Sequence, residues 1–293
     1  MENRLADIIS ASLQQGKLPH ALLIETLDLA KTQSELPDLV AMLLCETPDY
    51  SASKGCGHCK QCQLLMAGNH PDFLSIEPTT NSIGIDEIRA VSNKFTTTAQ
   101  LAQAQVVVIQ NAQLMTENAA NALLKTLEEP NAKCYLVLVS VGYVKLMPTI
   151  ISRCQQIRQP VLSKDALKQK YPNLPDYLVG FADQNESLLV KMAEPDELNE
   201  YVRVYQSFIT WLKGQESSAT LLSNIASKDE LIEFWVYLVS RRIRQVLMKG
   251  YLQPAEQAQA LIHEFNFTRR QVKGHNKALA LTSLVHQLEG LIR

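Results

Sequence analysis

The chain has few glycines: 11 among its 293 residues, about half of the usual share of ~7%. A phosphate-binding loop needs glycines, because successive backbone N–H groups must approach the phosphates. Few such loops are therefore expected. The chain also has no run of about 18 apolar residues, which argues against a membrane-spanning helix. Its longest apolar run covers residues 39–45.

Neither sign of charge is in large excess. There are 28 Lys and Arg against 30 Asp and Glu, for a net charge of −2, which excludes a globally basic nucleic-acid coat and leaves only a local patch for DNA. Glu2 and Asp7 stand in an N-terminal segment without an apolar core, so no secretory signal is predicted. We expect a cytoplasmic protein of two or three domains.

The first 160 residues alternate strand-like and helix-like segments. Apolar runs predict strands buried on both faces of a parallel sheet, at residues 21–24, 73–76, 106–109 and 135–139. A helix is predicted over 117–129, capped by Thr116 and stopped by Pro130, and another over 85–95, opened by Asp86. This pattern indicates an α/β domain with helices on both sides of the sheet.

After residue 160 the strand signals end and helical patterns continue. Short helices are predicted over 165–193, broken by Pro172, Pro175 and Gly180. Longer helices are predicted over 198–213, 229–249, 254–267 and 270–292. Pro195 and the change in helix length place a second boundary near residue 197. The predicted domains are an α/β domain over 1–160, a small helical domain over 161–197 and an all-helical domain over 198–293.

Four cysteines follow a metal-binding spacing, in the order Cys45, Cys56, Cys59 and Cys62. A C-x2-C knuckle supplies two zinc ligands from one tight turn, and Gly55 and Gly57 give the backbone the freedom to make it. No acid–base group for a catalytic zinc stands nearby. The sequence therefore predicts a structural Zn²⁺ site within residues 45–62.

Other interpretations of these residues remain open. His58 could be the fourth ligand in place of Cys45, or the three clustered cysteines could be reactive thiols beside an ordinary buried Cys45. Cys134 opens a predicted buried strand and is interpreted as a core residue. His70 and Asp72 are interpreted as part of the turn into the strand at residue 73, and not as a catalytic pair.

The turn after the first strand lacks a working phosphate loop. It runs from Glu25 to Gln33 without a glycine, and Ala30 stands before Lys31 and Thr32 where a G-K-T motif would have glycine. Side chains would therefore occupy the space that phosphates need.

The acidic motif of a nucleotide site is also degenerate. Gln110 and Asn111 follow the strand at 106–109, where a carboxylate would hold magnesium. Neutral amides keep a similar shape but lose the charge that holds the cation. The sequence thus predicts a nucleotide-binding fold that has lost both parts of its site and binds no ATP itself.

Three strings together with the cysteine insert resemble the bacterial clamp-loader subunits. They are Leu18-Pro-His-Ala21, Asn121-Ala-Leu-Leu-Lys-Thr-Leu-Glu-Glu-Pro130 and Pro148-Thr-Ile-Ile-Ser152-Arg153-Cys154. The resemblance covers nearly all of residues 1–160, while the helical remainder matches only in kind. It implies an AAA+ (P-loop-NTPase-like) domain with a zinc module, an all-α lid and an all-α C-terminal collar that joins five subunits in a ring.

Within this family, gamma/tau subunits carry an intact phosphate loop and an Asp-Glu pair, and delta subunits lack the Ser-Arg-Cys triplet and the zinc cysteines. The combination found here is similar to the delta prime subunits of DNA polymerase III. The resemblance implies a non-hydrolysing subunit with no independent catalytic activity. Its implied partners are gamma/tau and delta and, through the complex, the sliding clamp and primer-template DNA.

The resemblance also implies roles for two arginines. Arg153, between Ser152 and Cys154, would reach in trans the ATP of a neighbouring gamma/tau subunit and neutralise charge on its γ-phosphate. For an arginine taken alone, a surface salt bridge is the alternative. Arg89 resembles a position on a helix lining the central chamber, where it would meet DNA phosphate. A solvated helix face is the alternative there.

A basic stripe in the helical half is interpreted as helix surface and collar packing, and it consists of Arg241, Arg242 and Arg244. On the same helix, Leu231, Trp235 and Leu238 share a face with Arg242, which suggests contact with a partner helix in the collar. Two alternative functions are an autonomous AAA+ ATPase and a zinc-dependent DNA-binding protein.

Overall fold

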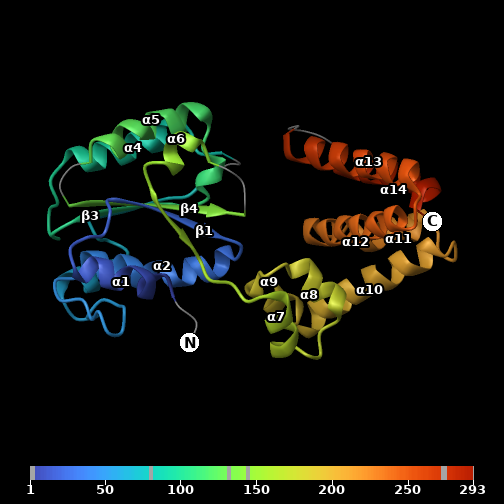
Figure 1. Ribbon diagram of the computed structural model, residues 1–293, viewed down its shortest axis with the longest axis horizontal. Helices are drawn as coiled ribbons and strands as arrows, with labels where there is room; N and C mark the ends of the chain where they lie inside the picture. Colours follow the sequence, from blue (N-terminus) through green and yellow to red (C-terminus); the bar gives the residue numbers. More distant parts are fainter. Residues whose placement is uncertain (1–3, 79–81, 131–132, 143–145, 272–275, 293) are drawn as a thin grey trace. The chain divides into compact units, whose positions relative to one another are not determined.

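The computed structural model describes residues 4–78, 82–130, 133–142, 146–271 and 276–292 (Figure 1). These residues form two compact units. The first is Met1–Ser163 with Gln184–Ser187, and the second is Lys164–Asp183 with Leu188–Arg293. The first unit is α/β and the second is helical throughout its described residues.

The first unit is built on a five-stranded sheet with the order β2-β3-β4-β1-β5. Every neighbouring pair of these strands is parallel. The strands are β1 (Ala21–Thr26), β2 (Phe73–Ile76), β3 (Gln105–Ile109), β4 (Cys134–Val141) and β5 (Gln155–Arg158). The central strands are apolar on both faces because both faces are covered by helices. The four predicted strands are therefore confirmed within one to two residues at each end.

Helices cover the two faces of the sheet, as Figure 1 shows. Leu22 and Ile24 point into a core with α1 (Leu5–Gln14) and α2 (Leu29–Leu44). Leu23 points to the opposite core, which contains α4 (Ile85–Thr96), α5 (Glu117–Glu128) and α6 (Pro148–Ile151). The shorter elements of this unit are α3 (Lys60–Met66) and the 3₁₀ turn η1 (Ala112–Leu114). The alternation of strand side chains thus produces a three-layer unit.

Helix starts follow capping chemistry. Thr116 caps α5 as predicted, because its side chain accepts a hydrogen bond from the N–H of Ala119. Asp86 does not open α4, however. Gly84 is the N-cap, and Glu87 reaches back to accept from its N–H at 3.1 Å. Asp86 lies in the first turn instead.

Two elements near Arg153 are not evident in the sequence. Strand β5 has a polar sequence in which only Ile157 is buried, so it lacks the apolar run that marks the other strands. The second element is the short helix α6, which precedes Arg153. Pro148 opens that helix at a position where proline is favoured.

The second unit consists of helices in its described residues. They are α7 (Lys164–Lys170), α8 (Asp176–Ala182), α9 (Glu186–Met192), α10 (Pro195–Leu212), α11 (Ser218–Ile225), α12 (Asp229–Met248), α13 (Leu252–Gln271) and α14 (Lys277–Ile292); the first two residues of α9 belong to the first unit. Gly180 lies inside α8 and does not break it. The helix predicted over 270–292 begins only at Lys277, and residues 272–275 lie outside the described part of the chain.

The core of the second unit is rich in aromatic side chains. Tyr177 stacks on Tyr205 at 3.8 Å between ring centroids, and Phe234 contacts Tyr201 edge to face. Trp235 is fully buried. The face that it shares with Leu231 and Leu238 is therefore part of this unit's own core, and the predicted contact with an external partner helix is wrong for that face.

The separation into lid and collar remains a prediction, because α10 begins at Pro195 and continues through the boundary near residue 197. Among the described helices, none combines the length and the apolar character that crossing a bilayer would require.

Candidate functional site

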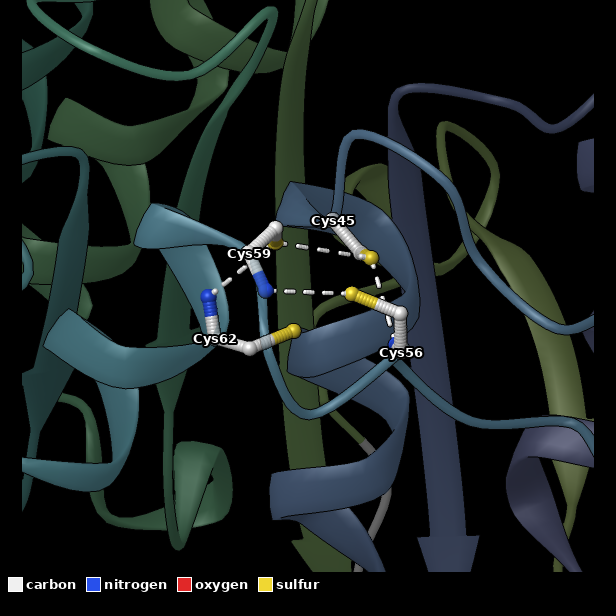
Figure 2. A group of neighbouring side chains, drawn as sticks. All are labelled: Cys45, Cys56, Cys59 and Cys62. Atoms are coloured by element: carbon white, nitrogen blue, oxygen red, sulfur yellow. Dashed lines mark hydrogen bonds between the residues drawn. The ribbon is translucent and has the colours of Figure 1, made fainter.

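The four cysteines of the predicted metal site lie close together, with the sulfur atoms within 4.8 Å of one another. Figure 2 shows the four side chains directed toward a common point. Cys45 is the C-cap of α2, and Cys59 is the N-cap of α3, one turn before Cys62. Cys56 lies in the connecting loop, where Gly57 adopts a positive φ of 78°. The fold thus brings together the end of one helix and the start of another.

The distances fit a tetrahedral ion. With Zn–S bonds of about 2.3 Å, tetrahedral sulfur atoms lie about 3.8 Å apart, and the Sγ atoms of Cys45 and Cys59 are 3.8 Å apart. Backbone N–H groups donate to the sulfurs, for example from Cys59 to Cys56 Sγ at 3.3 Å. Such donors favour the thiolate that binds metal. The four cysteines form a possible metal site, consistent with a structural zinc.

The thiols differ in their electrostatic surroundings. Backbone hydrogen bonds from His58 and Cys59 lower the pKa of Cys56 to about 6. Burial raises the pKa of Cys62 to about 12. A metal cation would offset the burial penalty on Cys62, because its charge stabilises the thiolate. His58 lies outside the group of four: it is exposed, and its Nδ1 lies 2.9 Å from the carbonyl oxygen of Cys56.

Close packing holds the cluster. A Cβ atom on Gly55 would lie 2.9 Å from Cys62 Sγ, so only glycine fits there without displacement. Gln61 accepts a hydrogen bond from His70 at 2.9 Å, since the other His70 nitrogen already accepts from the N–H of Asp72. The Asp72 carboxylate accepts from three successive backbone N–H groups in the loop 100–102. His70 and Asp72 thus brace the turn before β2, as the sequence predicted.

The N-terminus of α2 is the position where a phosphate would bind in this kind of fold, and a carboxylate of the chain itself lies there. Asp28 is the N-cap and is 1% exposed. Its Oδ1 accepts from the N–H of Lys31 at 3.0 Å, and its Oδ2 accepts from the N–H of Ser187 at 2.9 Å. A negative group at this helix end satisfies free N–H groups and interacts favourably with the helix dipole.

The hydroxyl that would hold magnesium is also engaged. Thr32 is fully buried and donates to Gln159 Oε1 at 2.5 Å. Thr26 lies 2.6 Å from the same oxygen. The turn predicted to be degenerate is therefore closed by side chains that bind one another, and Gln159 comes from the segment after β5.

The amides after β3 have structural partners. Gln110 accepts from Gln33 at 2.7 Å and donates to Glu77 at 2.5 Å. Asn111 has a φ of +53°, a left-handed conformation that asparagine adopts more readily than most residues. It accepts from Gln113 at 3.2 Å. These contacts engage both ends of the Gln110 amide and the oxygen of the Asn111 amide.

Arg153 lies at the surface with a side chain that is 34% exposed. Its Nη2 is 2.6 Å from Glu128 Oε1, and its Nη1 donates to the carbonyl oxygen of Thr149 at 2.9 Å. The adjacent Cys154 packs against the core, and burial raises its pKa to about 11. The triplet thus directs one side chain inward and holds the arginine at the surface.

The other basic candidates are exposed. Arg89 pairs with Asp86 at 2.8 Å across one helical turn, and both are well solvated. Arg241 and Arg244 are exposed on α12, while Arg242 donates to the carbonyl oxygen of Ile292 at 3.1 Å. Arg89 and the stripe are surface residues in the structure, and a DNA contact for Arg89 stays a hypothesis.

Comparison with known proteins identifies the family. A family model described as "DNA polymerase III, delta subunit" matches residues 1–163, which is more than half of the chain. The curated relatives include the DNA polymerase III subunit delta' of Escherichia coli, 42% identical over 147 residues. The chain belongs to the DNA polymerase III delta prime family. The resemblance predicted from the sequence strings is confirmed.

The delta prime relatives are matched over part of their length. The E. coli alignment covers 50% of this chain and 43% of that protein. The Bacillus subtilis subunit delta' is 31% identical over 209 residues, covering 68% of this chain and 61% of that protein. The chain therefore spans about half of the length of the curated relatives it matches.

A solved structure shows the fold over the whole chain. The crystal structure of a DNA polymerase III gamma subunit-related protein from Thermotoga maritima superposes with a TM-score of 0.53 at 18% identity, covering 98% of this chain and 99% of that one. The fold is that of an AAA+-type α/β unit with a cysteine module and a helical unit. The predicted fold class is confirmed.

Three residues at these sites were not predicted from the sequence: Asp28, Gln159 and Glu128. Asp28 carries a recognisable signal, because an aspartate just before a helical pattern is a typical N-cap. Gln159 and Glu128 carry none. They lie 127 residues from Thr32 and 25 residues from Arg153, so only the fold brings each pair together.

Proposed function

We propose that this chain is the non-hydrolysing delta prime subunit of a DNA polymerase III clamp loader in the cytoplasm. It would assemble with gamma/tau and delta subunits in a five-membered ring that places the sliding clamp on primer-template DNA. The chain would bind no ATP and would supply Arg153 in trans to the ATP of a neighbouring gamma/tau subunit. Family membership supports the complex, and the geometry of the α/β unit supports the division of labour.

The observation that carries the proposal is the Asp28 carboxylate at the N-terminus of α2. A triphosphate at this position would meet a buried carboxylate that already accepts from the N–H of Lys31, and repulsion between like charges opposes binding. Thr32 would have to give up its bond to Gln159 to reach a magnesium ion. Both changes act against ATP binding by this chain.

Arg153 has the chemistry that a neighbouring ATP site requires. Its cationic guanidinium presents a planar fork that matches phosphate oxygens. As the bond to the γ-phosphate weakens, negative charge spreads over the transferring group, and a cation supplied in trans stabilises that charge. Surface exposure of Arg153 is compatible with this reach.

The zinc in this proposal has no catalytic step. Cys45, Cys56, Cys59 and Cys62 would hold it in a closed tetrahedral set, which leaves no open position for substrate. When bound, the ion would cross-link the end of α2, the connecting loop and the start of α3. Backbone N–H groups that donate to the sulfurs of Cys45, Cys56 and Cys59 would help to hold these thiolates in place.

Reconstitution tests the proposal. The chain is mixed with gamma/tau and delta, and assembly and ATP turnover are measured with the natural chain and with Arg153→Ala. Assembly should be unchanged, and turnover at the dependent site should fall, toward the lower end of the ~10³–10⁵-fold range of trans arginines. Arg153→Lys should not restore it, because lysine lacks the planar fork. Unchanged turnover and clamp loading with Arg153→Ala would contradict the finger.

A nucleotide titration of the isolated chain separates the alternatives. Micromolar ATP binding would support an autonomous ATPase and overturn the closed-site interpretation. A zinc-dependent DNA-binding protein would lose DNA binding on metal removal while its assembly stayed intact. We expect neither outcome, since residues 57–61 of the knuckle offer little aromatic surface for stacking and only Lys60 as a formal positive charge.

A further inference from the structure

Two groups contact the guanidinium of Arg153, one at each terminal nitrogen. Nη2 meets Glu128 Oε1 at 2.6 Å, and Nη1 donates to the Thr149 carbonyl at 2.9 Å. Glu128 is the last residue of α5, and Thr149 lies within α6. The arginine is thus held between the ends of two helices that pack on the same face of the sheet.

Both anchors are exposed, but each is next to a buried residue. Leu127, next to Glu128, is 3% exposed, and Ile150, next to Thr149, is fully buried. An arginine side chain carries about 2 kcal/mol of rotamer entropy. Two contacts on well-packed elements restrict that freedom before any phosphate arrives, which lowers the ordering cost of binding.

The anchors leave donors available. A guanidinium has five N–H donors, and the Glu128 and Thr149 contacts use one on each terminal nitrogen. The remaining donors, including Nε–H, can meet phosphate oxygens while the two anchors stay in place. The anchoring therefore does not require release of Glu128 before Arg153 can act.

We infer that Glu128 is a positioning residue, which orients Arg153 toward the ATP phosphates of the neighbouring subunit. This inference rests on the proposed function. It assigns Glu128 an indirect role: its carboxylate contacts the arginine and not the nucleotide. The Thr149 carbonyl provides the second fixed point of the same orientation.

The sequence offers a matched control beside it. Glu129 is exposed, carries the same charge and follows directly at the C-cap of α5. Among the described contacts, the carboxylate near Arg153 is that of Glu128. Removing either carboxylate changes the net charge equally, so a difference between the two variants reports the contact with Arg153.

The experiment uses the loader reconstituted with gamma/tau and delta, with Glu128→Ala, Glu128→Gln, Glu129→Ala, Arg153→Ala and the double variant Glu128→Ala/Arg153→Ala. Glu128→Ala should lower kcat for ATP by about tenfold to 10²-fold, the cost of a misplaced catalytic group, with assembly unchanged. Glu128→Gln keeps an acceptor oxygen and should recover most of the loss. Glu129→Ala should match the natural chain, and the double variant should match Arg153→Ala.

The outcomes separate this inference from the proposed function. If Arg153→Ala lowers turnover but Glu128→Ala behaves like Glu129→Ala, the positioning role is wrong and the finger stands. A rise in turnover with Glu128→Ala also overturns it, because the carboxylate would then restrain the arginine. If Arg153→Ala itself has no effect, the proposed function fails first. Thermal melting of the isolated variants checks that each has folded.

Discussion

The two ends of helix α2 differ in which groups satisfy them. At the N-terminus, the Asp28 carboxylate accepts from two backbone N–H groups and is almost fully buried. At the C-terminus, Cys45 joins three other thiols whose sulfurs converge within 4.8 Å. The first end satisfies its polar groups with the chain's own atoms. The second gathers four soft ligands around one point, which is the arrangement that a metal ion completes.

The N-terminal end of α2 is therefore a closed site, and the C-terminal end is an open site that a metal ion would complete. A helix N-terminus binds anions when its N–H groups are free, and here the Asp28 carboxylate already accepts from one of them, the N–H of Lys31. Clustered thiols gain little from one another, because bringing thiolates together without a cation costs electrostatic energy. We therefore expect the C-terminal end of α2 to depend on an added ligand and the N-terminal end to be independent of one.

The largest effect should come from breaking the cysteine end. The purified chain should hold one zinc ion, and chelation or Cys59→Ala should remove it and unfold the loop between α2 and α3. Structural zinc contributes on the order of 10 kcal/mol in small modules. Zinc content by mass spectrometry and amide exchange over residues 45–66 measure this. Cys134→Ala is the control, since that buried thiol lies outside the cluster. A metal-free chain with a protected loop would contradict the expectation.

Breaking the carboxylate end should cost less. Asp28→Ala removes the acceptor for Lys31 and Ser187, and we expect the free energy of unfolding to fall by about 2–3 kcal/mol. Amide exchange at Lys31 and Ser187 should accelerate. Asp38→Ala on the same helix is the control, because its exposed pair with Arg4 should contribute less than about 1 kcal/mol. Equal losses in the two variants would show that Asp28 has no special role.

The sequence predicts some features at the two ends of α2 and misses others. The cysteine cluster was predictable because two C-x2-C steps are local and each makes its own turn. The loss of the phosphate loop was also predictable, since Ala30 replaces a glycine. What fills the space was not, because Gln159 reaches Thr32 across 127 residues. Strand β5 was missed for a related reason: its neighbours and not its own polar residues place it at the edge of the sheet.

A smaller effect is expected from Gly55→Ala, which tests whether the cysteine cluster depends on close packing. Gly55→Ala would place a Cβ 2.9 Å from Cys62 Sγ and 3.0 Å from Ala41 Cβ. We expect a loss of about 1–3 kcal/mol from overpacking, together with weaker zinc binding in a competition titration. Gly290→Ala is the control, since among the described residues nothing beyond its chain neighbours and its own helix backbone lies within 4 Å of its would-be Cβ. Tight zinc binding by Gly55→Ala would show that the loop can shift.

The smallest expected effect concerns pH at the brace beside the cysteines. Burial alone would raise the pKa of Asp72, but hydrogen bonds from the backbone N–H groups of Ala102, Gln100 and Leu101 bring its pKa below the ordinary value. A depressed pKa in the folded state stabilises the protein above the unfolded pKa of about 3.9, and this stabilisation is lost as pH falls through the folded pKa.

Asp72→Asn isolates this contribution. The difference in the free energy of unfolding between the natural chain and Asp72→Asn should be constant above about pH 5 and should shrink in more acidic solution. Metal loss in acid affects both chains and cancels in the difference. A difference that stays the same down to pH 3 would contradict the role of the Asp72 charge.

The contacts of the Asp28 carboxylate with Lys31 and Ser187 have one more consequence. Because this carboxylate is covalently part of the chain, it cannot dissociate, exchange or be diluted, and its effective local concentration is set by the fold alone. The hydrogen bond from the Ser187 N–H to Asp28 therefore does not depend on the ratio of ATP to ADP. In the clamp loader proposed above, where gamma/tau subunits would bind and release ATP, this segment would keep one conformation throughout the cycle.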